Sequence, residues 1–93
     1  MITHKLVSEI DRIKRHAKIL RLVVEKGPLG IFKLSRISGF PPHQVRYSLR
    51  ILERLGLIVP SSKGAVATIK GKRSLRALKE EVEKIKEKLS EIF

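Results

Sequence analysis

A run of polar and basic side chains lies between residues 42 and 54 of this 93-residue chain. On a helix, the face opposite the apolar residues of this segment would present His43, Gln44, Arg46, Tyr47, Arg50 and Arg54. An Arg guanidinium can donate two hydrogen bonds to O6 and N7 of guanine, and a Gln amide can pair with N6 and N7 of adenine. These residue types are therefore candidates for reading base edges in duplex DNA.

The helix that would carry them is predicted from its apolar positions. Val45, Ser48, Leu49 and Leu52 fall on one face and Leu55 follows, so we expect this side to be buried. Pro42 suits a first helical position, where its missing N–H costs nothing. The opposite face contains no carboxylate before Glu53. An ordinary solvated helix face is the alternative, but such a face usually includes glutamate, so DNA binding is favoured.

A shorter helix is predicted just before it, over residues 31–38, with Ile31, Leu34 and Ile37 on its buried side. Gly39 suits the positive φ that ends such a helix. Two helices joined by a short turn that contains glycine form a helix-turn-helix, whose second helix can lie in the DNA major groove. Cations near such a helix would contact phosphates and fix the register. For this role we predict Lys33, Arg36, Arg54 and Lys63. The alternative for Lys33, Arg36 and Lys63, which is favoured for each of them taken alone, is an ordinary solvated side chain.

Three further elements are predicted. Apolar residues spaced by three and four indicate a helix over about residues 4–26, which Gly27 and Pro28 end. Two short β-prone runs around the turn SSKG predict a hairpin over residues 57–69, with Pro60 at an edge or turn. A last helix should start after Thr68, a suitable N-cap, and run to the C-terminus.

The last helix carries an apolar row with heptad spacing. The row consists of Leu75, Leu78, Val82, Ile85, Leu89 and Ile92. We expect it, together with helix 4–26, to form a homodimer interface that places two recognition helices about 34 Å apart. Packing of the row against helix 4–26 of the same chain is the alternative. Exposed charge pairs do not decide between parallel and antiparallel dimers, since each contributes roughly 0.2–1 kcal/mol.

Composition favours a polyanionic partner. The formal net charge is +12, and residues 27–68 carry six cations against the single carboxylate of Glu53. Such a surface attracts phosphates and releases counterions on binding. A charge-rich protein of a thermophile is the less specific alternative. Aromatic residues make up 4% of the chain, so the core should be aliphatic.

Other classes of function find little support in the sequence. Cysteine is absent, and His4, His16 and His43 lack companions at ligand spacing, so neither a disulfide nor a metal site is expected. No glycine-rich phosphate loop occurs, so we expect no enzyme and no cofactor. No apolar run approaches the roughly 20 residues that cross a bilayer, which favours a cytoplasmic protein without membrane contact.

Three motifs resemble the winged helix-turn-helix family of transcription regulators. They are KLSRISGF, PHQVRYSLRILERLGLI and TIKGK, in this order between residues 33 and 72. The resemblance implies a mainly α fold with a small β-hairpin (the wing) and a long C-terminal helix. A DNA-binding domain would span residues 1–70, with the helix-turn-helix at 31–55 and the wing at 57–69. A dimerisation helix would span residues 71–93. It also implies that His43, Gln44, Tyr47 and Arg50 contact bases or nearby phosphates, with Arg46 more lateral.

Three functions remain open at this point. The first is a sequence-specific regulator that binds double-stranded DNA as a homodimer. The second is an architectural or chromatin protein with little base preference, and the third is an interaction module for an acidic protein or RNA. Gln44 and Tyr47 favour the first, because nonspecific binders need only Lys and Arg. The sequence identifies no small-molecule effector.

Overall fold

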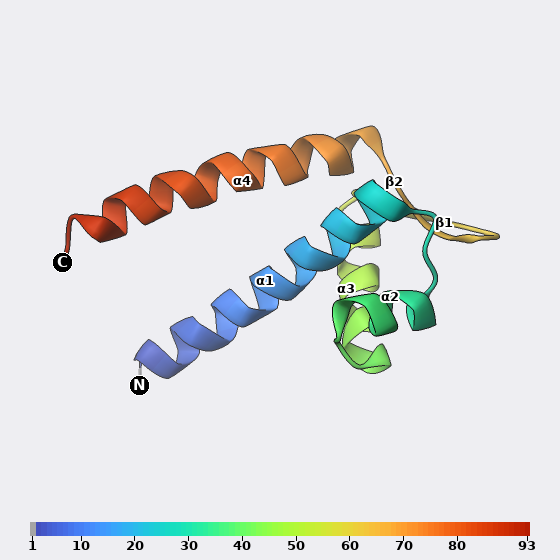
Figure 1. Ribbon diagram of the computed structural model, residues 1–93, viewed down its shortest axis with the longest axis horizontal. Coiled ribbons are helices and arrows are strands. Elements are labelled where there is room, and N and C mark those ends of the chain that lie inside the picture. The colour runs from blue at the N-terminus through green and yellow to red at the C-terminus, as the bar shows by residue number, and fades with distance from the viewer. Residues whose placement is uncertain (1) are drawn as a thin grey trace.

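The computed structural model describes residues 2–93 and is mainly helical with one small β-hairpin, as predicted. The elements in chain order are α1 (Ile2–Lys26), α2 (Ile31–Ser38), α3 (Pro42–Arg54), β1 (Ile58–Ser61), β2 (Gly64–Ala67) and α4 (Ile69–Ser90). Figure 1 shows α2 and α3 packed beside the second half of α1, with the hairpin and the start of α4 at its C-terminal end. The predicted bounds of α2 and the predicted start of α3 are confirmed.

The core is aliphatic, as the low aromatic content predicted. Its buried residues are Ile19, Leu20, Leu22, Val23, Leu29, Leu34, Val45, Leu52, Leu57 and Ile58. They come from the second half of α1, from α2 and α3, and from the segments that follow α1 and α3. Each such side chain contributes roughly 1.5–3 kcal/mol relative to an exposed one. The first half of α1 and the second half of α4 contribute none of these residues.

Two residues predicted to be buried are exposed. Ile37 is 38% exposed and Leu55 is 53% exposed. On α2 the buried row ends at Ser38 instead of Ile37, because the Ser38 hydroxyl turns inward and accepts a hydrogen bond from the Phe40 N–H at 3.2 Å. At the end of α3 the chain reverses through Gly56, at φ 77°, and Leu57 enters the core in place of Leu55.

The turn between α2 and α3 is fixed by local hydrogen bonds. Gly39 has φ 83°, the left-handed conformation predicted for it, and its N–H donates to the Ser35 carbonyl. The Ser35 hydroxyl donates to the Phe40 carbonyl at 2.6 Å. From α1, the Lys18 ammonium lies 5.4 Å from the Phe40 ring centroid, within the range of a cation–π contact. These contacts set the angle at which α3 leaves α2.

The hairpin is extended by a segment that sequence patterns did not identify. Leu29, between α1 and α2, forms an antiparallel bridge with Ala65 through hydrogen bonds of 3.1 and 2.8 Å. Gly64 adopts φ 121°, and a Cβ at this position would collide with the Leu29 backbone. β1 is therefore the outer strand, and Pro60 pairs with Ala65 at a position whose N–H is not needed for the ladder. The predicted edge position of Pro60 is confirmed.

The start of α4 is attached firmly to the core. Thr68 is the N-cap, as predicted, and its hydroxyl accepts from the Gly71 N–H at 3.0 Å and donates to the Gly56 carbonyl at 2.7 Å. Gly71 is buried so closely against the Leu57 carbonyl that a side chain would collide with it. The helix then runs to Ser90, three residues short of the predicted end at the C-terminus.

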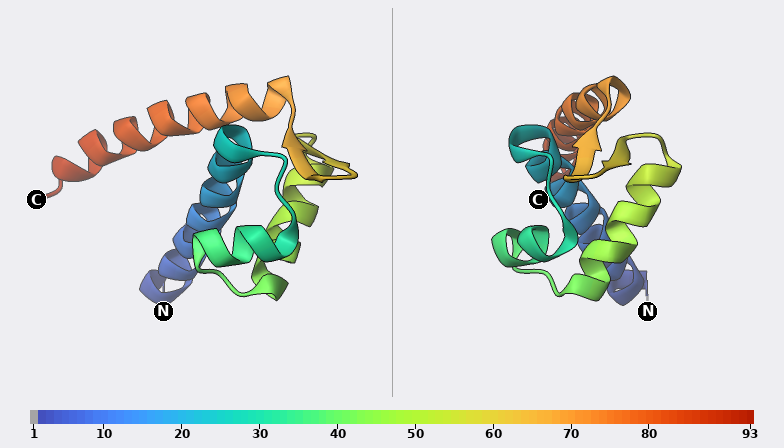
Figure 2. Two further views of the ribbon diagram at one scale, coloured as in Figure 1. Left: turned by 45° about the vertical axis from the view of Figure 1, so that its right-hand side comes forward. Right: turned by 90° about the vertical axis from the view of Figure 1, so that its right-hand side faces the viewer.

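Beyond their packed ends, α1 and α4 diverge. Figures 1 and 2 show the two long helices meeting near the hairpin and separating toward the two termini. Their distal halves leave apolar side chains exposed, in a molecule 48 Å long and 27 Å wide. These side chains are Leu6, Val7, Ile10 and Ile13 on α1, and Val82, Ile85, Leu89 and Ile92 on α4.

Candidate nucleic-acid interface

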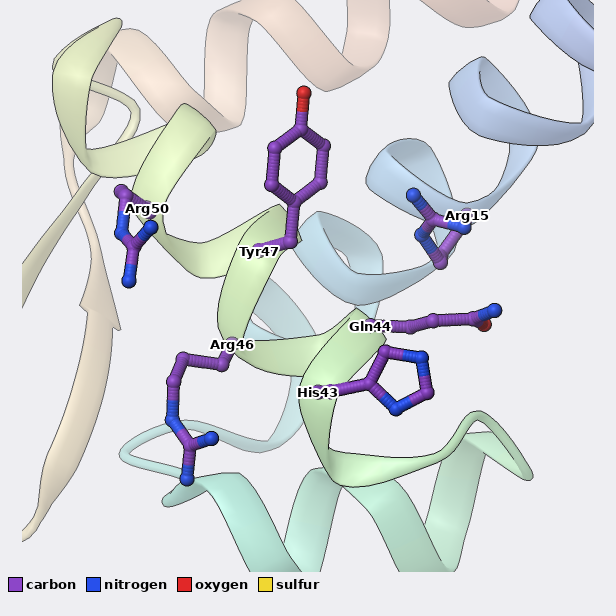
Figure 3. Close-up of a pocket in the computed structure, with 6 residues that line it drawn as sticks. All are labelled: Arg15, His43, Gln44, Arg46, Tyr47 and Arg50. Atoms are coloured by element: carbon purple, nitrogen blue, oxygen red, sulfur yellow. The ribbon is translucent and has the colours of Figure 1, made fainter.

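The outward face of α3 forms an open hollow of about 480 Å³. It is lined by Arg15, His43, Gln44, Arg46, Tyr47 and Arg50. All five residues predicted to read bases therefore lie on one surface. In Figure 3, His43 and Gln44 point to the side of α3 on which Arg15 of α1 lies, whereas Arg46 and Arg50 project on the other side, with Tyr47 between them.

Burial of the opposite face of α3 sets this orientation. Val45 and Ser48 are fully buried, and Leu52 is 3% exposed. Because α-helical residues three and four apart share a face, burying this row directs the intervening side chains outward. Tyr47 is 42% exposed and Gln44 is half-buried. The basic residues of the same face are exposed, and these are His43, Arg46, Arg50 and Arg54. Since α4 does not cover this face, the hollow is open to a ligand.

The residues predicted to contact phosphates lie on three elements. Lys33 and Arg36 are on α2, Arg54 is on the last turn of α3, and Lys63 is in the turn between β1 and β2, and all four are exposed. Ser61 shapes that turn, since its hydroxyl accepts from the Lys63 N–H at 3.2 Å. The structure thus places exposed cations on α2, at the end of α3 and in the hairpin turn, on either side of the hollow in the sequence.

These cations are not neutralised by carboxylates. Within residues 2–93 the structure contains one side-chain ion pair, between Lys86 and Glu83 at 3.7 Å on α4. No acidic residue is among those lining the hollow on α3. The positive charge of this surface is therefore available to an external anion.

Arg15 of α1 lines this hollow and His16 contacts α3 beside it, and neither residue was predicted from the sequence. Arg15 donates from Nε to the Ser48 hydroxyl at 3.2 Å, and His16 Nδ1 lies 2.8 Å from the same oxygen. The Arg15 guanidinium carbon and the His16 ring centroid lie 5.9 and 5.8 Å from the Tyr47 ring centroid. Ser48 in an apolar row was the available signal, because a buried hydroxyl requires a hydrogen-bond partner.

The environment of His16 favours its neutral form. Burial lowers the pKa of His16 below 6.5, and the positive charges of Arg15 and then Arg12 lower this pKa further. Because Arg15 Nε can only donate to Ser48, the serine hydroxyl proton is free to be donated to a neutral Nδ1. The buried Ser48 hydroxyl thus joins α3 to α1 through one hydrogen bond with Arg15 and one with His16.

The residues predicted for the dimer interface differ in exposure. Leu75 and Leu78 are half-buried, and Leu75 packs against the core. Val82 is 39% exposed, and the exposed fraction rises to 66% at Ile92. Packing within the same chain, the alternative for this row, therefore accounts for Leu75 and Leu78 but leaves the row exposed from Val82 onward.

Within residues 2–93, no group of three His, Asp or Glu side chains is arranged to bind a metal ion. In the same part of the chain, no helix has the length and apolar character needed to cross a membrane. Neither the family models nor the curated proteins compared with this chain match it.

Proposed function

We propose that this protein binds double-stranded DNA as a homodimeric, sequence-specific transcription regulator of the winged helix-turn-helix type. The observation that carries the proposal is the open face of α3. On this face, side chains that can form hydrogen bonds with base edges occur together with cations that have no carboxylate partner. An α-helix with side chains is about 10–12 Å wide, and the major groove is about 12 Å wide. Insertion of α3 would bring its first two turns to the base edges.

The contacts would divide by position. His43, Gln44, Tyr47 and Arg50 would reach bases, with Arg46 at the side of the groove. Cations at the margin of this surface would bind phosphates, which fix orientation without reading sequence. These are Lys33, Arg36, Arg54 and Lys63. We also propose that the protein acts in the cytoplasm.

A second copy of the chain is the partner that best fits the distal halves of α1 and α4. Apolar side chains that are exposed in a row along a helix favour an interaction site. Residues 2–14 carry three cations and two carboxylates, and residues 80–93 carry three cations and five carboxylates. Residues 15–79, in contrast, carry 15 cations and two carboxylates. Two copies can therefore approach through their distal halves without strong repulsion.

An architectural DNA-binding protein is the second candidate, and the net charge of +12 favours it. An architectural protein needs no base contacts, whereas a sequence-specific regulator does. The presence of Gln44 and Tyr47 in the hollow therefore favours the sequence-specific regulator. A protein or RNA interaction module would be expected to expose apolar residues on α3. Ile51, the one such candidate in the sequence, is half-buried and does not line the hollow.

Arg50→Ala tests the base-reading role of α3. On the best duplex selected from random DNA, we expect a loss of about 1–3 kcal/mol in binding free energy and relaxed preference at one base pair. Arg21→Ala is the matched control, because Arg21 is exposed on α1 and does not line the hollow. Equal weakening by Arg50→Ala on every duplex would show that this residue contacts phosphate instead of a base.

A further inference from the structure

Arg15 of α1 lies against the outward face of α3. It lines the hollow on α3 and also a second hollow of about 390 Å³ along α1. The second hollow is lined by His4, Val7, Ser8, Asp11, Arg12 and Arg15. Within residues 2–93, Arg15 is the one residue that lines both hollows, so it lies at the junction between the outward face of α3 and the first half of α1.

The side chain of Arg15 is oriented by α3 and not by its own helix. Asp11 lies one turn earlier on α1, at the spacing that favours ion pairs, yet within residues 2–93 the two form none. Arg15 instead donates from Nε to the fully buried Ser48 hydroxyl, and its guanidinium lies against the Tyr47 ring. The Ser48 oxygen is contacted on its other side by His16.

This arrangement leaves the phosphate-binding edge of the guanidinium free. A guanidinium has five N–H donors, and Nε carries one of them. The four donors on the two terminal nitrogens make no hydrogen bond within residues 2–93. Parallel donation from such a planar group to two oxygens is the geometry by which arginine binds phosphate. A side chain fixed in advance also loses less conformational freedom when the ligand binds.

We propose that Arg15 binds a phosphate of the DNA backbone beside the segment read by α3, and that Ser48 and His16 are its positioning residues. This inference rests on the proposed function, since it extends the DNA surface onto α1. The ligand is a phosphodiester, so the contact is independent of base sequence. α1 thus has two roles, one in the core and one at the DNA.

The salt dependence of DNA binding tests the contact. Each phosphate neutralised contributes about −0.9 to the slope of log Kobs against log salt concentration on B-DNA. For Arg15→Ala we expect this slope to become shallower by about that amount, on a mixed-sequence duplex and on the selected duplex alike. Arg21→Ala, which removes an exposed arginine of the same helix, should leave the slope unchanged.

Arg15→Lys separates charge from orientation. Lysine retains the positive charge, but it cannot donate to Ser48 while presenting a planar pair of donors to phosphate. The expected slope is that of the wild-type protein, with an affinity between those of the wild type and Arg15→Ala. Wild-type affinity for Arg15→Lys would overturn the oriented contact.

Ser48→Ala, alone and combined with Arg15→Ala, tests the positioning role. If Ser48 acts through Arg15, Ser48→Ala weakens DNA binding in the wild-type background and has no effect on Arg15→Ala. An equal loss of DNA-binding affinity on adding Ser48→Ala to the wild type and to Arg15→Ala would reject this role. Circular dichroism verifies that each variant is folded. Where Ser48→Ala does not fold, the comparison of Arg15→Lys with Arg15→Ala decides.

The failure of this inference is distinguishable from failure of the proposed function. A wild-type protein that does not bind duplex DNA overturns the proposed function. A wild-type protein that binds while Arg15→Ala behaves like Arg21→Ala overturns only the role of Arg15.

Discussion

At the scale of single residues, the proposed DNA-binding face depends on which side chains of α3 are buried. The five side chains predicted to read bases could be placed on one face because the helical period and the apolar row determine their direction. Arg15 could not, since its position in the hollow depends on how α1 crosses α3. That crossing involves Ser48, where the sequence shows only a small polar residue among apolar ones.

The lowered pKa of His16 predicts that the free energy of unfolding depends on pH. Its pKa is lowered in the folded protein, so the unfolded chain takes up a proton at higher pH than the folded chain. This contribution to the free energy of unfolding is therefore full above pH 6.5 and is lost as the pH falls through the lowered pKa. Urea denaturation at pH values above and below 6.5 measures the effect.

His16→Gln should make the free energy of unfolding less dependent on pH across this window. An unchanged pH dependence in His16→Gln would contradict the assignment to His16.

At the scale of elements, the features predicted correctly are those set by local sequence. The features that were missed or assigned wrongly depend on tertiary contacts. Gly39 and Thr68 behave as predicted because a left-handed turn and an N-cap are local features. The bridge at Leu29 was missed because one paired residue has no periodicity. Ile37 and Leu55 were assigned to the core because apolar spacing alone does not show where a helix stops packing.

The exposed row on α4 yields a prediction about assembly. Val82→Lys combined with Ile85→Lys should convert the proposed dimer to monomers, because two charges would enter an apolar contact. The control is Ala77→Lys with Ser90→Lys, which adds the same charge at exposed positions outside the row. Sedimentation velocity distinguishes the species. A wild-type monomer, or a dimer that persists in the Val82/Ile85 variant, would contradict the interface.

At the scale of the whole molecule, charge and apolar surface are separated. Residues 15–79 carry 15 cations and two carboxylates, and the exposed apolar rows lie in the nearly neutral distal halves of α1 and α4. Under the proposed function, one end of the molecule would contact DNA and the other a second copy of the chain. This separation follows from the fold, since Figure 1 shows both distal halves extending away from α2 and α3.

Selection of bound duplexes from random DNA, performed with the wild-type protein at two salt concentrations, tests the central claim most directly. We expect one sequence with two related half-sites, about 10–10.5 base pairs apart from centre to centre, to be enriched at both concentrations. Binding at the higher salt concentration should be weaker but still selective, because base contacts depend less on counterion release than phosphate contacts do. Binding without any enriched sequence, lost as the salt concentration rises, would contradict base reading by α3.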